Sequence, residues 1–369
     1  MKIGTLTFHF AHNYGAMLQA YALPTKLKQL GYDAEVIDYR LPFIYDGFEK
    51  FSFGDFIESY KRKGNDSFIA FLKAVKNWHH NQNKDAKWYR FEDFLNNYLP
   101  KSVRISDKSS ILNLGYNAII CGSDQIWNSH LTGGLIPLYF GDGLTDGRKI
   151  ISYAASNGES FVSKEMWNDF YKLISNFDSI SVREKGLNDY LNNHGITSHL
   201  VLDPVFLLTK EEWIKISVNP LEGDYVFTYS FNEPPHFFET ADKVAKMLGK
   251  KLVCFRFEQS DKVPVDAIQI TTGGPRELLG YIHHASIVIS NSFHGIALSI
   301  IMEKQLINVP PLTTRERTDS IMSEVGLKDR IIEDGCDFTF SSNIDYEQVS
   351  KKVKSLRNES LDFLINSLK

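Results

Sequence analysis

Residues 1–39, MKIGTLTFHFAHNYGAMLQAYALPTKLKQLGYDAEVIDY, decide the class of fold expected for this chain. The β-rich run Ile3–Phe8 predicts a strand, and after a short turn Ala16–Leu30 carries apolar residues at helical spacing. Gly31 then occupies the position that commonly follows a helix C-terminus. A second strand is expected at Glu35–Tyr39. A strand, a helix and a strand at this spacing are typical of a βαβ unit and indicate a parallel sheet.

The same alternation continues along the chain. Further strands are expected at Tyr116–Cys121, Ile150–Ala154, Ser179–Arg183, His199–Leu202, Tyr225–Tyr229, Leu252–Phe255 and Ser286–Ser290. Helices are expected at Glu184–Asn192, Phe237–Leu248, Arg276–His284 and Tyr346–Ser367. We therefore predict an α/β protein with two Rossmann-like domains that face a cleft. The first domain is expected to cover 1–210 and the second 222–340, with the boundary near 205–222. The helix within 345–369 is expected to pack back on the first domain.

Residues at about 41–110 interrupt the first domain with a different pattern, in which aromatic and charged residues alternate at helical spacing. We predict a mainly helical insertion there. Its aromatic residues Trp78, Trp88 and Tyr89 leave two interpretations open. They could stack on the faces of sugar rings, or the helices could simply pack against the first domain, which the pattern favours.

Bulk composition sets limits on the class of protein. The chain has 369 residues, which suits two domains because single cores rarely grow beyond about 250–300 residues. Its net charge of −4 does not suggest nucleic acid or an acidic membrane as a partner. The three cysteines are far apart, there is no apolar run long enough to span a membrane, and no signal-peptide pattern opens the chain. A cytoplasmic protein is therefore expected, whereas its oligomeric state is not predicted.

Four polar loops follow predicted strands, at the edge where ligands bind in parallel α/β sheets. They are Asn13-Tyr14-Gly15, Gly122-Ser123-Asp124-Gln125, Arg183-Glu184-Lys185-Gly186 and Ser290-Asn291-Ser292-Phe293-His294-Gly295. The first two have an alternative interpretation as plain turns with helix caps. No histidine, cysteine or carboxylate pattern has the spacing of metal ligands, so no metal is expected.

The loop at 290–295 combines several features that suit an anionic substrate. Ser290, Asn291 and Ser292 lead into a helix N-terminus, whose unpaired amides favour an anion. His294 can pass a proton near neutral pH, and Gly295 permits close approach of substrate or backbone. The alternative is that the polar residues only cap the helix and His294 is a structural histidine.

Arg183 stands between a predicted strand and a predicted helix. A guanidinium there can hold a carboxylate or phosphate with two parallel hydrogen bonds. The alternative is an i,i+4 or surface ion pair with a carboxylate. Both interpretations remain open on the residues alone.

Five motifs, taken in order, resemble those of the polysaccharide pyruvyl transferase family. They are Asn13–Leu23, Ile120–Asn128, Ser181–Glu184, Leu202–Val205 and Ser290–Gly295, and together they extend over about residues 1–330 without covering 41–110 well. The resemblance implies a fold similar to GT-B glycosyltransferases. It also implies that the protein transfers the enolpyruvyl group of phosphoenolpyruvate to a sugar and forms a pyruvate ketal, in polysaccharide or exopolysaccharide biosynthesis.

The resemblance also implies roles for individual residues. His294 matches the candidate general acid/base and Arg183 a candidate donor ligand, while Arg317 resembles part of a basic loop that follows Pro310-Pro311. The substrate-binding residues expected are Asn13, Tyr14, Gly15, Ser123, Asp124, Ser290, Asn291, Ser292 and Gly295. The expected partners are phosphoenolpyruvate and a sugar or lipid-linked glycan acceptor, with no cofactor and no nucleic acid. The alternatives are a GT-B-like glycosyltransferase that uses a nucleotide sugar, and a non-catalytic glycan-binding relative.

Overall fold

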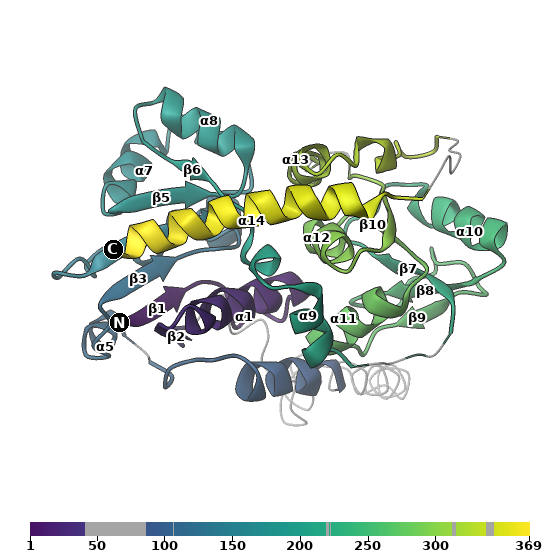
Figure 1. Ribbon diagram of the computed structural model, residues 1–369, viewed down its shortest axis with the longest axis horizontal. Helices are drawn as coiled ribbons and strands as arrows, with labels where there is room; N and C mark the ends of the chain where they lie inside the picture. Colours follow the sequence, from purple (N-terminus) through teal and green to yellow (C-terminus); the bar gives the residue numbers. More distant parts are fainter. Residues whose placement is uncertain (41–85, 106, 219–220, 222, 312–314, 337–342) are drawn as a thin grey trace, which may run out of the picture.

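The computed structural model describes residues 1–40, 86–105, 107–218, 221, 223–311, 315–336 and 343–369. Two parallel β-sheets flanked by helices form its two halves (Figure 1). This arrangement confirms the predicted α/β class with two Rossmann-like units. Trp78 lies outside the described residues, as does most of the predicted insertion.

The first sheet has six strands in the order β2-β1-β3-β4-β5-β6. Their bounds are β1 (Lys2–Leu6), β2 (Asp33–Val36), β3 (Ala118–Cys121), β4 (Lys149–Ala155), β5 (Ser179–Val182) and β6 (His199–Leu200). Buried apolar residues fill the central strands, as expected for a sheet covered on both faces. The strand order reverses between β1 and β3, where Ile3 pairs with Ala118.

The second sheet has five strands in the order β11-β10-β7-β8-β9. Their bounds are β7 (Tyr225–Tyr229), β8 (Lys251–Phe255), β9 (Ile268–Ile270), β10 (Ile287–Ser290) and β11 (Gln305–Asn308). Here the order reverses between β7 and β10, where Val226 pairs with Ile287. In each sheet, the connections that follow this pair of neighbouring strands therefore run in opposite directions along the sheet.

Helices connect these strands and cover the sheets. The α-helices are α1 (Tyr14–Gln29), an unlabelled helix at 86–97, α5 (Lys108–Leu112), α6 (Ser129–Thr132), α7 (Trp167–Ile174), α8 (Lys185–Asn193), α9 (Lys210–Ile216), α10 (Phe237–Leu248), α11 (Pro275–His284), α12 (Phe293–Ile301), α13 (Glu316–Glu324) and α14 (Tyr346–Leu368). Short 3₁₀ helices are η2 (Pro137–Phe140), η3 (Pro204–Leu207) and η4 (Lys328–Arg330). Gly31 follows α1 with φ of 89°, which is the left-handed conformation expected after a helix.

The helix α14 leaves the second sheet and crosses the first, where it appears as the long yellow helix in Figure 1. Its Leu364 and Leu368 join Ile3 and Ile151 in one buried cluster. Ser360 Oγ accepts a hydrogen bond of 2.9 Å from the amide of Leu202. The chain therefore returns to the first sheet after it has built the second.

The helix at 86–97 also contacts both halves. Phe91, Phe94 and Leu95 on it are buried in the large core shared by α1 and the second sheet. Lys87 Nζ and Arg90 NH1 donate hydrogen bonds to backbone carbonyls that follow β8 and β9. Packing thus accounts for the apolar positions of this helix.

Candidate functional site

A cleft of about 740 Å³ opens between the two sheets. It lies at both positions where strand order reverses, because its walls come from the segments after β1, β3, β7 and β10. In open α/β sheets the diverging loops at such a position leave a crevice where ligands bind. Here the crevices of two sheets face each other and form one cavity.

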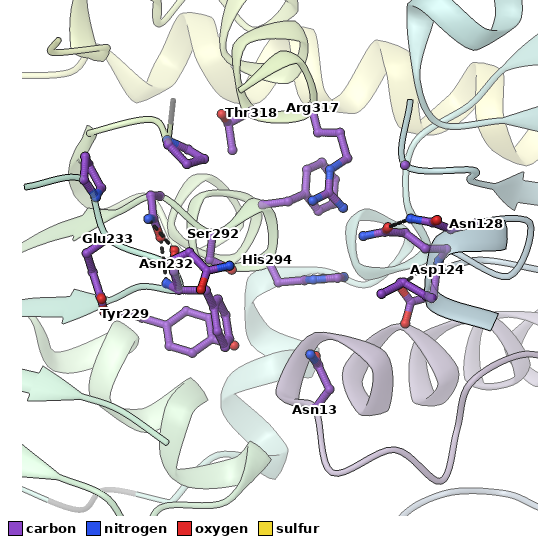
Figure 2. Close-up of a pocket in the computed structure, with 18 of the residues that line it drawn as sticks. Asn13, Asp124, Asn128, Tyr229, Asn232, Glu233, Ser292, His294, Arg317 and Thr318 are labelled. Carbon is purple, nitrogen blue, oxygen red and sulfur yellow. Dashed lines mark hydrogen bonds between the residues drawn. The ribbon is translucent and has the colours of Figure 1, made fainter. Parts of the chain in front are cut away.

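Figure 2 shows the labelled side chains of this cleft. Asn13 at the start of α1 and Asp124 after β3 lie on the side of the first sheet. Tyr229 and Ser292 lie on the side of the second sheet, and His294 extends between the two groups. The site is therefore assembled from residues far apart in sequence.

His294 occupies the first turn of α12, which Ser292 caps. Its side chain is 12% exposed. A Cβ atom added to Gly15 would overlap Nδ1, Cγ and Cε1 of the imidazole, so the first turn of α1 packs against the face of this ring. Gly15 is thus required by its close approach to His294, which lines the cleft.

The other ring nitrogen of His294 faces a buried carboxylate. Nε2 lies 3.8 Å from Asp203 Oδ2 and has no hydrogen-bond partner within the described part of the chain. The same Oδ2 atom lies 2.7 Å from Arg183 NH1 and 3.0 Å from Ser123 Oγ. Asp203 Oδ1 accepts from the amide of Val205. The carboxylate is therefore held in a fixed position behind the imidazole.

These neighbours shift the protonation equilibria of both groups. Burial lowers the pKa of His294 below its ordinary value, with Asp203 opposing this shift and Arg183 adding to it. Burial would raise the pKa of Asp203, but the charges of His294 and Arg183 outweigh burial and lower it. At neutral pH the site therefore contains a neutral imidazole beside an ionised carboxylate.

Arg183 lies behind this pair and does not line the main cleft. Its side chain is 2% exposed, and its Nε lies 3.2 Å from Glu184 Oε1. Its guanidinium also lies over the ring of Phe293 at 5.2 Å. The structure thus places Arg183 in a buried ion network rather than in a surface ion pair. Direct contact between Arg183 and a donor stays a prediction.

Arg317 is the only lysine or arginine among the described residues that line the main cleft. It lies in the first turn of α13, whereas the sequence placed it in a loop. Its Nε is buried and has no acceptor among the described residues. Burial, followed by repulsion from Arg183, lowers its pKa from the usual arginine value. This guanidinium can therefore receive an anion in the cleft.

Several residues that were predicted to bind substrate use their polar atoms in hydrogen bonds inside the protein. Tyr14 is fully buried and its hydroxyl donates to the carbonyl of Gly273 at 3.0 Å. Ser290 is buried and bonds the carbonyl of Tyr229, and a Cβ added to Gly295 would overlap the Ser290 hydroxyl. These positions correct the prediction that Tyr14 and Ser290 reach the substrate, because their polar atoms are already used inside the protein.

Asn291 lines the cleft, and its side chain also holds the segment after β7 through hydrogen bonds. Its side chain exchanges two hydrogen bonds with the backbone of Phe231, at 2.9 and 2.7 Å. Ser123, also predicted to bind substrate, is fully buried and contacts Asp203. Asn13, Asp124 and Ser292 line the cleft, while Gly15 shapes it through His294, and their contact with substrate stays a prediction.

Sequence analysis did not assign a role in the site to Asp203 or to Glu233. Asp203 stood only in the Leu202–Val205 motif, directly after the predicted strand His199–Leu202. Glu233 lines the cleft and pairs with Arg256 at 2.6 Å. A buried carboxylate that faces a histidine from another domain leaves no local pattern in the sequence.

Two searches for other features concern only the described ranges. There, no group of three or more histidine, cysteine, aspartate or glutamate side chains is arranged to hold a metal ion. No helix in the same ranges combines the length and apolar character needed to cross a bilayer.

Comparisons with known proteins agree with this architecture. UDP-N-acetylglucosamine 2-epimerase from Rickettsia bellii aligns with 100% of this chain and 97% of its own, at 10% identity and a TM-score of 0.51. The same enzyme from Neisseria meningitidis aligns over 100% and 99%, at 9% identity and a TM-score of 0.48. The glycosyltransferase SnogD from Streptomyces nogalater aligns over 98% and 95%, at 9% identity and a TM-score of 0.43.

At such identities the likeness concerns the fold alone, and of these three structures the Rickettsia bellii enzyme is the one whose TM-score exceeds 0.5. A search of curated proteins finds no match to this sequence. The profile of the polysaccharide pyruvyl transferase family, by contrast, matches residues 13–311, which include every strand except β1 and the whole lining of the cleft except Arg317 and Thr318. The chain therefore belongs to the polysaccharide pyruvyl transferase family.

Proposed function

We propose that this protein transfers the enolpyruvyl group of phosphoenolpyruvate to two hydroxyls of a sugar in a polysaccharide or lipid-linked glycan precursor, forming a pyruvate ketal. The observation that carries the proposal is the pairing of His294 and Arg317 in one cleft. The first supplies a neutral imidazole, and the second supplies a guanidinium with a free N–H group. Family membership supports a transferase that acts in polysaccharide biosynthesis.

The donor carries a phosphate and a carboxylate, so it needs positive groups. We assign the phosphate or the carboxylate to Arg317, which can form charge-assisted hydrogen bonds. The first turns of α1 and α12 both begin at the cleft, capped by Asn13 and Ser292. Their amides and the positive ends of their dipoles would hold the second anionic group.

The chemistry requires two protons to move. C3 of phosphoenolpyruvate gains a proton and becomes a methyl group, which makes C2 cation-like. One sugar hydroxyl then adds to C2 and a second closes the ketal, while the bond from C2 to the phosphate oxygen breaks. The two hydroxyl protons are accounted for by the new methyl group and by the released hydrogen phosphate.

His294 suits the role of the group that moves these protons. Because its imidazole is neutral, Nδ1 can first accept the proton of an attacking hydroxyl and then donate it. Asp203 faces the opposite nitrogen and would stabilise the charged imidazolium between these steps. General acid/base catalysis of this kind typically contributes about 10²–10⁴-fold in rate.

A donor screen tests the proposal. Purified protein is incubated with phosphoenolpyruvate and a panel of glycosides, and release of inorganic phosphate is measured beside formation of the pyruvylated sugar. UDP-, GDP- and dTDP-sugars are tested in parallel for nucleotide release. We expect phosphate release that depends on the sugar. Nucleotide release from a sugar nucleotide, without turnover of phosphoenolpyruvate, would replace the proposal with a glycosyltransferase.

A further inference from the structure

A second cavity of about 350 Å³ adjoins the catalytic cleft. It lies between the segments that follow β3 and β4, and we name it the side pocket, defined by Asn128, Leu135, Glu159, Phe161 and Glu165 with their neighbours. Buried Trp127 and Phe170 also line it, and their rings meet edge to face at 5.6 Å. Asn128 and Glu159 line the main cleft as well, so the two cavities are adjacent.

The junction of the two cavities is tightly built. Asn128 and Glu159 line both of them, and Gly158 lies between, with φ of 80°. A Cβ atom on Gly158 would stand 2.6 Å from Asn128 Nδ2 and from Gln125 Oε1, so no larger residue fits. Asn128 Nδ2 donates a hydrogen bond to Gln125 Oε1. The side pocket and the catalytic cleft therefore share the side chains of Asn128 and Glu159.

The outer wall of the side pocket presents an apolar surface held by hydrogen bonds. Phe161 is 51% exposed, although large apolar side chains usually avoid such exposure. Its carbonyl accepts from Asn157 Nδ2 at 2.7 Å, and the carbonyl of Val162 accepts from the hydroxyl of Tyr190 at 3.1 Å. An exposed aromatic ring on an anchored segment is a suitable platform for a flat apolar surface.

The charge of the side pocket differs from that of the main cleft near Arg317, where we place the donor. Glu159 and Glu165 line it, and no lysine or arginine does so within the described residues. His130 at its rim is 80% exposed and 3.9 Å from Glu159. These carboxylates repel phosphoenolpyruvate, but they accept hydrogen bonds from neutral hydroxyls. The pocket thus selects against the donor and in favour of a polyhydroxylated neutral ligand.

We propose that the side pocket binds the pyranose unit adjacent to the sugar that receives the pyruvyl group. A pyranose has an apolar face of C–H groups, which Phe161 can cover, and hydroxyls around its edge, which Asn128 and Glu159 can bind. The enzyme would then recognise at least two linked sugars rather than a free monosaccharide. This inference rests on the proposed function for the identity of the neighbouring reaction.

The test compares matched saccharides on wild-type protein and on Phe161→Ala. The probes are p-nitrophenyl glycosides of glucose, galactose, lactose and cellobiose, with phosphoenolpyruvate as donor. For wild type we expect a lower KM for the disaccharides. Phe161→Ala should raise the disaccharide KM about tenfold relative to the monosaccharide KM, the effect of losing a buried aromatic contact. Tyr171→Ala is the matched control, because Tyr171 is 53% exposed but does not line the pocket.

A binding measurement separates this inference from the reaction itself. Saturation-transfer NMR of the same saccharides, without any donor, reports contact whether or not phosphoenolpyruvate is used. A disaccharide signal that weakens in Phe161→Ala and persists in Tyr171→Ala supports the side pocket, even if no pyruvyl transfer occurs. Disaccharides that bind no better than monosaccharides, or that bind equally to wild type and Phe161→Ala, would overturn it.

Discussion

His294 Nε2 and Asp203 Oδ2 lie 3.8 Å apart across the boundary between the two halves of the molecule. This separation is longer than a hydrogen bond. Catalytic hydrogen bonds often tighten only when substrate binds. Movement of the second sheet towards the first by less than 1 Å, a rough figure from normal hydrogen-bond lengths, would join the two groups. Closure of the cleft and activation of the imidazole would then be one event.

Replacement of His294 tests its role in proton transfer. We expect His294→Ala to lower turnover about 10²–10⁴-fold, because it removes the imidazole that accepts the hydroxyl proton. The melting temperature should change little. The matched control is His284→Ala, since His284 is exposed at the end of α11. Normal turnover of His294→Ala together with a lower melting temperature would leave His294 with a structural role only.

The pH dependence of the reaction tests whether Asp203 orients and charges His294. The neutral imidazole is the base, so kcat/KM should fall as pH decreases through the lowered pKa of His294. The charge of Asp203 raises that pKa, so Asp203→Asn should lower it further and shift the acidic limb of the profile to lower pH, with a smaller plateau.

Ser123→Ala is the companion variant, because it removes a hydrogen bond to Asp203 but keeps the carboxylate charge. The acidic limb of the pH profile of Ser123→Ala should lie at the same pH as that of the wild type. If Asp203→Asn loses stability but keeps the wild-type limb, Asp203 acts only in packing.

Removal of Arg317 tests the donor site. We expect Arg317→Ala to weaken phosphoenolpyruvate binding by about 1.5–3 kcal/mol, the usual effect of losing a hydrogen bond to a charged group. Arg317→Lys should restore it only in part, because an ammonium lacks the planar fork. Arg315→Ala is the control, since Arg315 pairs with Glu333 and Asp319 away from the cleft. Calorimetric titration with phosphoenolpyruvate measures all three.

Arg183 is expected to affect stability first. Arg183→Ala leaves Asp203 and Glu184 buried without their partner, and breaking a buried ion pair costs about 3–5 kcal/mol. Urea denaturation measures this loss. Titration of the folded protein with phosphoenolpyruvate tests the separate prediction of donor contact, for which we expect a loss of about 1.5–3 kcal/mol. Unchanged affinity would restrict Arg183 to the buried network.

Replacement of Gly15 tests whether the position of the His294 ring matters, without any change of charge. Gly15→Ala would push a methyl group into the imidazole of His294. Displacement of a catalytic group by about 1 Å can cost on the order of 10²-fold in rate. We expect kcat to fall by roughly that factor, while Arg317 and donor affinity are little affected. Equal losses of kcat and of donor affinity would point to a wider distortion.

Much of the fold follows from local patterns. The predicted strand Tyr225–Tyr229 and helix Phe237–Leu248 match β7 and α10, because apolar runs and the following Gly249 mark their ends. The predicted strand His199–Leu202 shortens to β6, since the amide of Leu202 bonds Ser360 from α14 rather than a strand. The short edge strand β9 was missed because its residues are only partly buried.

The site was predictable where a loop follows a strand, as with His294, Asp124 and Asn13. It was not predictable where a role depends on partners from distant segments. Arg183 has the same local setting as a ligand for an anion, yet three carboxylates from its own half surround it. Only the tertiary structure distinguishes an arginine enclosed by carboxylates from one that lines the cleft.

The return of α14 to the first sheet has a consequence for the order in which the protein matures during synthesis. The strands β1 to β6 leave the ribosome early. The buried cluster around Ile3 and Ile151 and the hydrogen bond of the Leu202 amide, however, can form only after α14 has been synthesised. The second sheet, whose strands lie within 225–308, has its own partners sooner. The half translated first is therefore finished last. Until then its uncovered apolar surface makes the nascent chain a client for chaperones.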